Sequence, residues 1–287
     1  GLHRGQLEML IRRDLGTRLS RLLRYASTSG DKFYRYGIMM SEVEQIMACI
    51  RAFNDEDNYK MIGELPLYIE KSTSFDIRAL AQVRDFNALL EVLDKTPYAD
   101  LIRPFSVTGM EEFDYTACES VLQKYFYDQV MKIVDQEFSG KVKKEIREIF
   151  LTQIELDNIT RIYRSKRYFN ATPAQIKKVI NPVYLRIPKR ELEDMIDHCN
   201  AEEFMERLAR SAYHNYLDSS NFAYIEYHAQ SINYNLNKRH MMFSTNPDIV
   251  LIAYLVLSET EIQNVVDIIE GVRYGIPADK INRLLIY

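Results

Sequence analysis

The chain has 287 residues, of which 47% are hydrophobic, and this is enough to bury a substantial core. Its 37 basic and 41 acidic residues give a net charge of −4, which is not the signature of a nucleic-acid-binding protein. Ten Gly and eight Pro are about half the usual share, so few turn residues remain for β-hairpins. Long helix-periodic runs lie between these breakers, and the sequence therefore predicts an all-α fold.

The first predicted element is a basic amphipathic helix over 6–25, in which leucines and Ile11 form one stripe and arginines occupy other faces. Such a helix can lie on anionic lipid or on an acidic partner, but we favour a packed helix with a solvated face. The segment 27–31, STSGD, is the first break. The acidic cluster 54–58, NDEDN, lacks the paired spacing of a Mg²⁺ site on a helix face, so we interpret it as a loop.

Further along, two kinds of element recur. Paired short helices are predicted at 75–83 and 86–101, and 190–213 lines up with 75–98 at a constant offset of 115 residues. Their matches are mostly apolar and end in Tyr98 and Tyr213, which we expect to be core residues with bonded hydroxyls. We call these the Leu…Tyr pairs. Long helical hairpins are predicted at 113–135 with 141–168, and at 222–242 with 249–274.

A signature segment ends each hairpin: QIELDNITRIYRSKRY at 153–168 and SETEIQNVVDIIEGVRY at 258–274, with an earlier copy, EVEQIMACIRAF, at 42–53. When Gln45, Asn158 and Asn264 are superposed, the copies are separated by 113 and 106 residues. In each copy the apolar residues recur at helical spacing, which predicts one buried face. Ser/Thr-x-x-Glu patterns precede the copies and predict capping boxes, with Thr152 and Glu155 opening one helix and Ser258 and Glu261 another.

These repeats predict three related modules: 1–70, 71–189 and 190–287. The first module has the basic helix and the signature but no preceding Leu…Tyr pair. The other two modules place Tyr98 and Tyr213 at 60 and 51 residues before their signature asparagines, and the same count back from Gln45 ends before Gly1. We therefore expect the native protein to extend further at its N-terminus.

Motifs of common catalytic and cofactor sites are missing from the sequence. It has neither a Gly-rich phosphate loop nor a G-x-S-x-G elbow, and its five histidines form no H-E-x-x-H pattern. We predict no catalytic residue, no cofactor and no metal site. The scattered Cys49, Cys118 and Cys199 suit a reducing cytoplasm. The longest apolar run, 249–257, has nine residues, whereas a membrane-spanning helix needs about 20.

The repeated E-[LI]-x-N-[IV]…R pattern resembles that of the C-type subunit of V/A-type rotary ATPases, whose counterpart in the eukaryotic vacuolar enzyme is the d-type subunit. The matching residues are 155–159 through 164–166, 264–274 and the closing segment 277–281, PADKI. The Leu…Tyr pairs also look like those of the family, and the resemblance covers nearly the whole chain from about residue 6.

The resemblance implies a funnel of three pseudo-symmetric helical modules without an active site. Such a protein lies on the cytoplasmic end of the membrane rotor ring of proteolipid subunits, and its central cavity receives the D and F proteins of the central stalk. It would be a peripheral, cytoplasmic adaptor that transmits torque for proton or sodium transport, with no membrane span of its own and no nucleic-acid partner.

We predict that the partner-binding residues belong to the signature copies. Helix N-termini offer free N–H groups to polar partners, and arginines could face an acidic stalk. The candidates are Glu42, Arg51, Glu155, Asn158, Arg164, Arg167, Asn264 and Arg273.

Two other functions remain open from the sequence. A helical-repeat scaffold could bind protein partners on a concave face, although such solenoids repeat every 30 to 50 residues or so, not above 100. An all-α lyase or prenyl-processing enzyme would need a deep pocket lined by acids that bind Mg²⁺.

Overall fold

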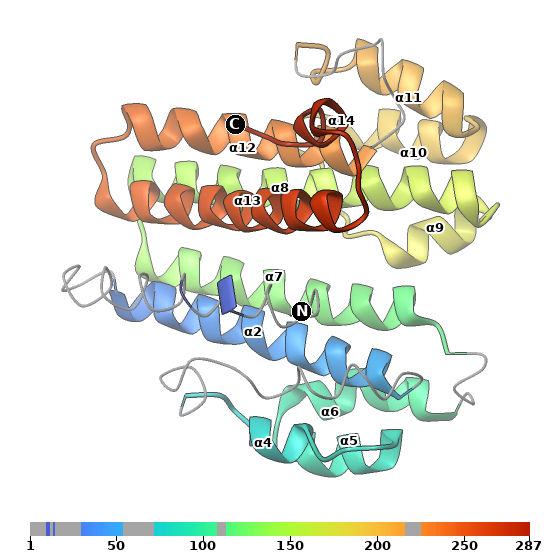
Figure 1. Ribbon diagram of the computed structural model, residues 1–287, viewed down its shortest axis with the longest axis vertical. Coiled ribbons are helices and arrows are strands. Elements are labelled where there is room, and N and C mark those ends of the chain that lie inside the picture. Colours follow the sequence, from blue (N-terminus) through green and yellow to red (C-terminus); the bar gives the residue numbers. More distant parts are fainter. Residues whose placement is uncertain (1–9, 12–13, 15–29, 54–71, 108–112, 216–224) are drawn as a thin grey trace. The chain divides into compact units, whose positions relative to one another are not determined.

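A computed structural model of the chain describes residues 10–11, 14, 30–53, 72–107, 113–215 and 225–287. The described residues form helices joined by short connections and contain no strand, which confirms the all-α prediction (Figure 1). The predicted basic helix at 6–25 and the acidic loop at 54–58 lie outside the described residues, apart from three positions of the helix.

The chain divides into two compact units, residues 1–133 and 134–287. The first contains α2 (Gly30–Ala52), α4 (Ile77–Leu80), α5 (Phe86–Leu93), α6 (Pro97–Ile102), the 3₁₀ turn η2 (Arg103–Val107) and most of α7 (Tyr115–Glu137). The second contains α8 (Gly140–Tyr168), α9 (Pro173–Val179), α10 (Lys189–His198), α11 (Ala201–Arg210), α12 (Ile225–Phe243), α13 (Pro247–Arg273) and α14 (Ala278–Asn282). The three predicted modules are defined by the repeat in the sequence and not by these two units, so their boundaries stay a prediction.

Local capping explains the short helices of the first Leu…Tyr pair. The Asp76 side chain accepts hydrogen bonds from two backbone N–H groups at the start of α4, and Asp85 accepts one from Ala88 at the start of α5. The single helix predicted over 86–101 is wrong, because the chain turns after α5 and begins again at α6. Pro97 lies in the first turn of α6, where its missing N–H costs nothing.

Three long helices, α8, α12 and α13, lie side by side in the second unit, while α9, α10 and α11 pack along the C-terminal half of α8 (Figure 1). Asn246 caps α13 by accepting hydrogen bonds from the N–H groups of Asp248 and Ile249, and Pro247 follows it in the first turn. The hairpin predicted at 222–242 and 249–274 therefore begins and ends within a few residues of α12 and α13.

The predicted helix starts within the signature copies are wrong. Thr152 lies in the interior of α8, and its hydroxyl donates to the Glu148 carbonyl at 2.7 Å, as Ser and Thr do in mid-helix. Ser258 likewise lies inside α13, and Ser41, which forms the same pattern with Glu44 at the first copy, lies inside α2. The helix continues through these sites because apolar residues before them are also buried, among them Ile146 and Phe150 in α8. Residues 30 and 31, predicted to belong to a break, already form the start of α2.

The predicted apolar face of the signature is buried in the copies on α2 and α8, whereas in the third copy, on α13, Val265 and Ile268 are exposed. In α8 it joins one cluster with the second Leu…Tyr pair, comprising Leu156, Ile159, Ile162, Leu192, Met195, Ile196, Phe204, Met205, Leu208 and Tyr213. In the first unit Ile46 and Ile50 of α2 are fully buried, as are Leu80, Leu89 and Leu93 of the first pair. Each Leu…Tyr pair therefore covers the signature helix to which its tyrosine is bonded.

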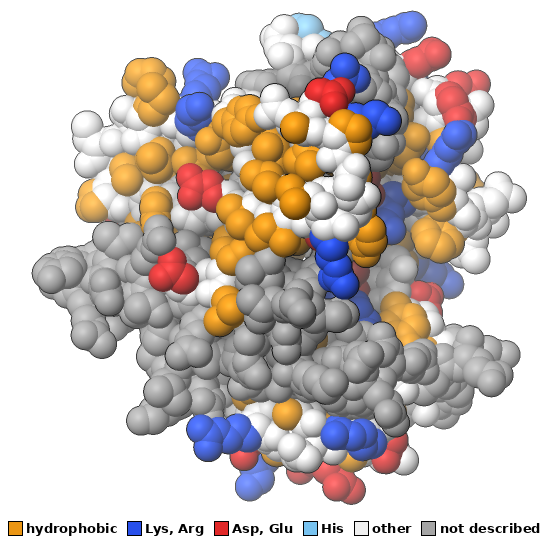
Figure 2. Space-filling model, in the orientation of Figure 1, with side chains coloured by type: hydrophobic (Ala, Val, Ile, Leu, Met, Phe, Trp, Pro, Cys, Tyr) orange, Lys and Arg blue, Asp and Glu red, His pale blue; other side chains and the backbone are white. Residues whose placement is uncertain are grey.

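One described helix, α13, is long and apolar enough to cross a membrane by its length and composition, which the nine-residue run at 249–257 did not indicate. The core helix of a soluble protein meets the same criterion, and 39% of the apolar window of α13 is buried. Hydrophobic side chains gather on the surface over this helix in the view of Figure 2.

Candidate functional site

Glu155, in the middle of α8, is the centre of a buried polar cluster. One carboxylate oxygen accepts hydrogen bonds from the consecutive backbone N–H groups of Leu185, Arg186 and Ile187 at 2.8, 2.9 and 3.1 Å. The other accepts the hydroxyl of Tyr213 at 2.5 Å. Successive N–H groups form a concave anion-binding loop, and here the anion is a side chain of the protein itself. The cluster fastens α8 to the loop before α10 and to the end of the second Leu…Tyr pair.

The surroundings of Tyr213 complete this cluster. Burial, followed by the neighbouring charge of Glu155, raises the pKa of the Tyr213 hydroxyl well above its usual range, so the phenol stays a donor at neutral pH. The Arg186 guanidinium lies 5.8 Å from the centre of the Tyr213 ring and donates to the Thr152 hydroxyl at 2.7 Å. Its second nitrogen is 3.3 Å from Glu148.

A second cluster of the same kind surrounds Glu42 of α2. Its carboxylate accepts the backbone N–H of Ser74 at 2.5 Å and the hydroxyl of Tyr98 at 2.6 Å. Burial and the same glutamate raise the pKa of Tyr98. The expectation that both repeat tyrosines are core residues with bonded hydroxyls is confirmed. The contact of each hydroxyl with a signature glutamate was not predicted. The tyrosine follows its glutamate by 56 residues in the first pair and by 58 residues in the second.

The signature asparagines hold backbone on the C-terminal side. Asn158 donates to the carbonyl of Asn181 at 2.6 Å and accepts its N–H at 2.9 Å. Asn264 makes the equivalent pair of bonds with Ile286, at 2.7 and 3.0 Å. A primary amide offers a donor and an acceptor side by side, which matches the C=O and N–H groups of one backbone residue. Both asparagines therefore fix the chain that follows their helix.

Two cations of α8, whose contacts the sequence analysis missed, bind the ends of neighbouring helices. Arg161 donates to the carbonyl of Val179 at the end of α9, at 2.7 Å. Lys166 donates to the carbonyls of Ile196 and Cys199 at the end of α10, at 2.7 and 2.6 Å. Carbonyls of a last helical turn lack partners within their helix, and a cation there also matches the helix dipole. Burial lowers the pKa of Lys166.

The predicted arginines lie at the surface. Arg51 forms an ion pair with Glu119 at 3.0 Å, Arg164 with Glu226 at 3.5 Å, and Arg167 with Glu202. These side chains are about half exposed, so each pair contributes little to stability. Arg273 is exposed at the end of α13, where the described part of the chain offers it no ion pair. Thus Glu42, Glu155 and Asn158 are buried in internal contacts, whereas the arginines remain accessible; partner binding by any of them stays a prediction.

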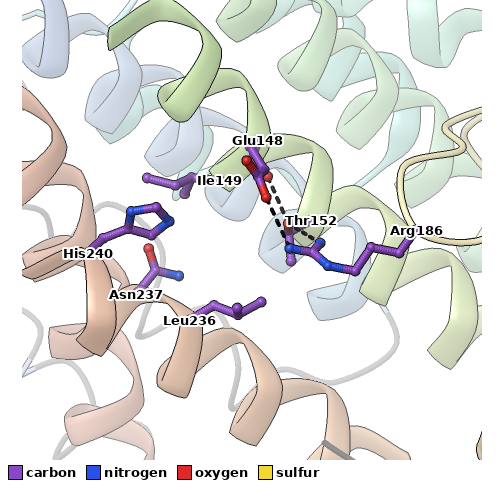
Figure 3. Close-up of a pocket in the computed structure, with 7 residues that line it drawn as sticks. All are labelled: Glu148, Ile149, Thr152, Arg186, Leu236, Asn237 and His240. Carbon is purple, nitrogen blue, oxygen red and sulfur yellow. Dashed lines mark hydrogen bonds and ion pairs between the residues drawn. The ribbon is translucent and has the colours of Figure 1, made fainter. Parts of the chain in front are cut away.

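A small cavity lies beside the Glu155 cluster, between α8 and α12 (Figure 3). Glu148, Thr152 and Arg186 form one side, and Asn237 and His240 face them across it. Its volume of about 30 Å³ is enough for a water molecule or two, whereas pockets for substrates or cofactors occupy roughly 300 Å³ or more. Among the described residues there is also no group of three His, Cys, Asp or Glu side chains arranged to hold a metal ion.

These clusters fasten helices to loops. They present no nucleophile beside a base, and each carboxylate oxygen accepts a hydrogen bond from the chain itself. The comparison with known protein families shows what kind of protein contains them. The family model of the ATP synthase (C/AC39) subunit matches residues 1–284. The chain belongs to this family.

The C/AC39 family comprises the C-type and d-type subunits of the V/A-type ATPases, which are non-catalytic structural parts of a membrane-associated complex. The resemblance found in the signature copies is therefore confirmed over nearly the whole chain. No curated protein matches the sequence.

Proposed function

We propose that this C/AC39 protein is the central-stalk adaptor of a V/A-type rotary ATPase. In this function it joins the D and F proteins of the stalk to the membrane rotor ring on the cytoplasmic side and carries torque between them. The three signature modules would surround a central cavity, as a funnel, and the stalk would be seated in it.

The observation that carries this proposal is the pair of buried Glu–Tyr clusters. An adaptor under torque must not let its helices slide, and a buried charge-assisted hydrogen bond resists sliding because either partner alone would be left unpaired. Glu42 with Tyr98 and Glu155 with Tyr213 each join a long helix to a segment more than 50 residues away. The clusters therefore support the proposal that the repeated pattern serves to make each module rigid.

The exposed signature arginines are the candidate contacts with the stalk. Arg164 and Arg273 lie near the C-terminal ends of α8 and α13 and are exposed, so an acidic partner surface could reach them. A stable interface buries on the order of 1,000 Å² or more, and charges at its rim mainly govern the association rate and its salt dependence.

The test is a titration of the purified protein with recombinant D–F stalk at several salt concentrations. We expect saturable one-to-one binding that weakens with salt, and a further weakening in R164E and R273E. The matched control is K141E, which makes the same charge change at the opposite end of α8, where Lys141 is 89% exposed.

Two results would count against the proposal. If the folded protein does not bind D–F at any salt concentration, the stalk-socket function is wrong and a general helical scaffold becomes the better explanation. If binding occurs but R164E and R273E bind as tightly as K141E, the adaptor function stands while the arginines lose their assigned contacts.

A further inference from the structure

The cavity between α8 and α12 is lined by a buried polar atom that the described residues leave unpaired. Asn237 of α12 is 2% exposed, and its side-chain NH₂ group donates to the carbonyl and side-chain oxygens of Asn233, at 2.8 and 3.1 Å. Its own side-chain oxygen, Oδ1, is buried and accepts no hydrogen bond from any described residue. A buried acceptor without a partner is costly, so such atoms in native proteins are nearly always bonded to protein or to ordered water.

The charges around the cavity restrict what could pair with this oxygen. The Arg186 guanidinium lines the side opposite Asn237, where it bonds to Thr152 and Glu148 (Figure 3). A cation in the cavity would be repelled by this guanidinium. An anion would meet the carboxylate of Glu148 and the unpaired oxygen of Asn237, which are both acceptors. The lining therefore suits a neutral molecule that donates and accepts hydrogen bonds.

The size of the cavity restricts the molecule further. Its volume of about 30 Å³ exceeds the 10–15 Å³ or so that one water needs, and it is far too small for an organic ligand. His240 follows Asn237 by three residues, so both side chains lie on the same face of α12. In Figure 3 the oxygen of Asn237 points toward the His240 ring, which offers a further polar group to a bound water.

We propose that this cavity is a binding site for an ordered water molecule, which donates a hydrogen bond to Asn237 Oδ1 and is held on the other side by the polar groups of Glu148 and Arg186. The backbone N–H of Arg186 also binds Glu155, so the water links α12 to the Glu155 cluster. A bridging water is enthalpically nearly as good as a direct hydrogen bond. The inference does not depend on the stalk proposal, since the water would bind to the isolated protein.

The direct test is a crystal structure of the protein at a resolution that shows ordered waters. We expect density for one water about 3 Å from Asn237 Oδ1 and from a second polar group on the α8 side of the cavity. An empty cavity would overturn the proposal. So would an Asn237 amide that is paired directly with His240, because no acceptor would then need a water. Bromide found there by anomalous scattering after a soak would also overturn it, since the site would then be one for anions.

A pair of matched variants tests the same site in solution. Asn235 and Asn237 each donate to the carbonyl four residues earlier in α12, but Asn235 is exposed, so N235L is the control for N237L. N237L displaces the water and leaves its other partners unpaired, so we expect it to melt about 3 °C or so below N235L.

A dry cavity predicts the opposite result. Leucine would then replace an unpaired acceptor with an apolar group of similar size, and stability would be kept or raised. An N237L protein that melts at or above the temperature of N235L would therefore overturn the proposal. If N237L does not fold, the crystal structure of the unsubstituted protein decides.

Discussion

Tyr213 donates its hydroxyl to the buried carboxylate of Glu155, and Tyr98 does the same for Glu42, although each pair is separated by more than 50 residues of sequence. In both pairs the glutamate belongs to a signature helix and the tyrosine to the Leu…Tyr pair that covers it. The repeat in the sequence is thus the repeat of a physical contact. In each repeat, a buried apolar face lies beside a buried glutamate whose carboxylate accepts the tyrosine hydroxyl.

Removing one of these hydroxyls should destabilise the protein without changing its fold. In Y213F the carboxylate of Glu155 keeps its backbone donors and loses one charge-assisted hydrogen bond, for a cost of about 2 kcal/mol. Urea unfolding followed by circular dichroism measures the change. Y168F is the matched control, because Tyr168 is 65% exposed, and its stability should equal that of the wild type. Equal stability of Y213F and Y168F would show that the hydroxyl contributes nothing.

The buried tyrosines should also make the protein sensitive to alkali. The pKa of Tyr98 and of Tyr213 is raised in the folded state, mainly by burial, so folding favours their protonated forms. Their stabilising effect is complete below the unfolded tyrosine pKa of about 10 and is lost as the pH rises above it. The free energy of unfolding should therefore fall above pH 10 or so, and less steeply in the double variant Y98F/Y213F. An equal decrease of the free energy of unfolding with pH in the wild type and in Y98F/Y213F would contradict this prediction.

The sequence predicts the helical class, the buried face of the first two signature copies and the pairing of repeated elements because each depends on a local period of apolar residues. It fails at Glu155. The pattern of Thr152 and Glu155 predicts a capping box, which is a contact within four residues, whereas the partners of Glu155 come from loop 185–187 and from Tyr213. Only the parallel recurrence of glutamate and tyrosine in two repeats within the chain could have indicated their contact.

The same limit explains the other missed contacts. Lys166 and Arg161 look like the basic end of a helix, as the dipole favours, yet their hydrogen bonds go to the ends of α10 and α9. A sequence pattern indicates that a charge is present but not which distant carbonyl it meets. Pro97, in contrast, is a local signal of a new helix start, and the prediction of a single helix over 86–101 overlooked it.

Asn264 offers a test of the loop contact by itself. N264A removes both hydrogen bonds to Ile286, at about 1 kcal/mol each, and leaves the helix intact. We expect faster hydrogen exchange of the Ile286 amide, with little change in the amides at the centre of α8. In N158A the equivalent bonds to Asn181 are lost from the more buried copy. Unchanged exchange at Ile286 would show that the contact does not hold the C-terminal segment.

The cysteines should report unfolding. Burial raises the pKa of the Cys49 and Cys118 thiols to about 12, so little reactive thiolate exists at pH 8, and both side chains are shielded from reagent. Cys199 is partly exposed. With a maleimide at pH 8 we expect one equivalent to react rapidly, and two more only as denaturant unfolds the chain. Rapid reaction of all three thiols in the folded protein would contradict the buried positions of Cys49 and Cys118.

Gly271 should be required for the seating of α14. A Cβ atom at this position would lie 2.5 Å from two side-chain carbons of Ile281, too close for any real contact. G271A should therefore displace α14 and destabilise the segment by about 1–3 kcal/mol, as overpacking does. Limited proteolysis after residue 274 measures the displacement.

The matched variant is I281A, which removes the clashing atoms. By itself it costs stability, because Ile281 is buried. In the double variant G271A/I281A the new methyl group no longer meets those carbons, so the combined loss should be smaller than the sum of the two single losses. Simple additivity would mean that α14 adjusts to the methyl group without resistance and that the close approach of Gly271 and Ile281 is not what fixes it.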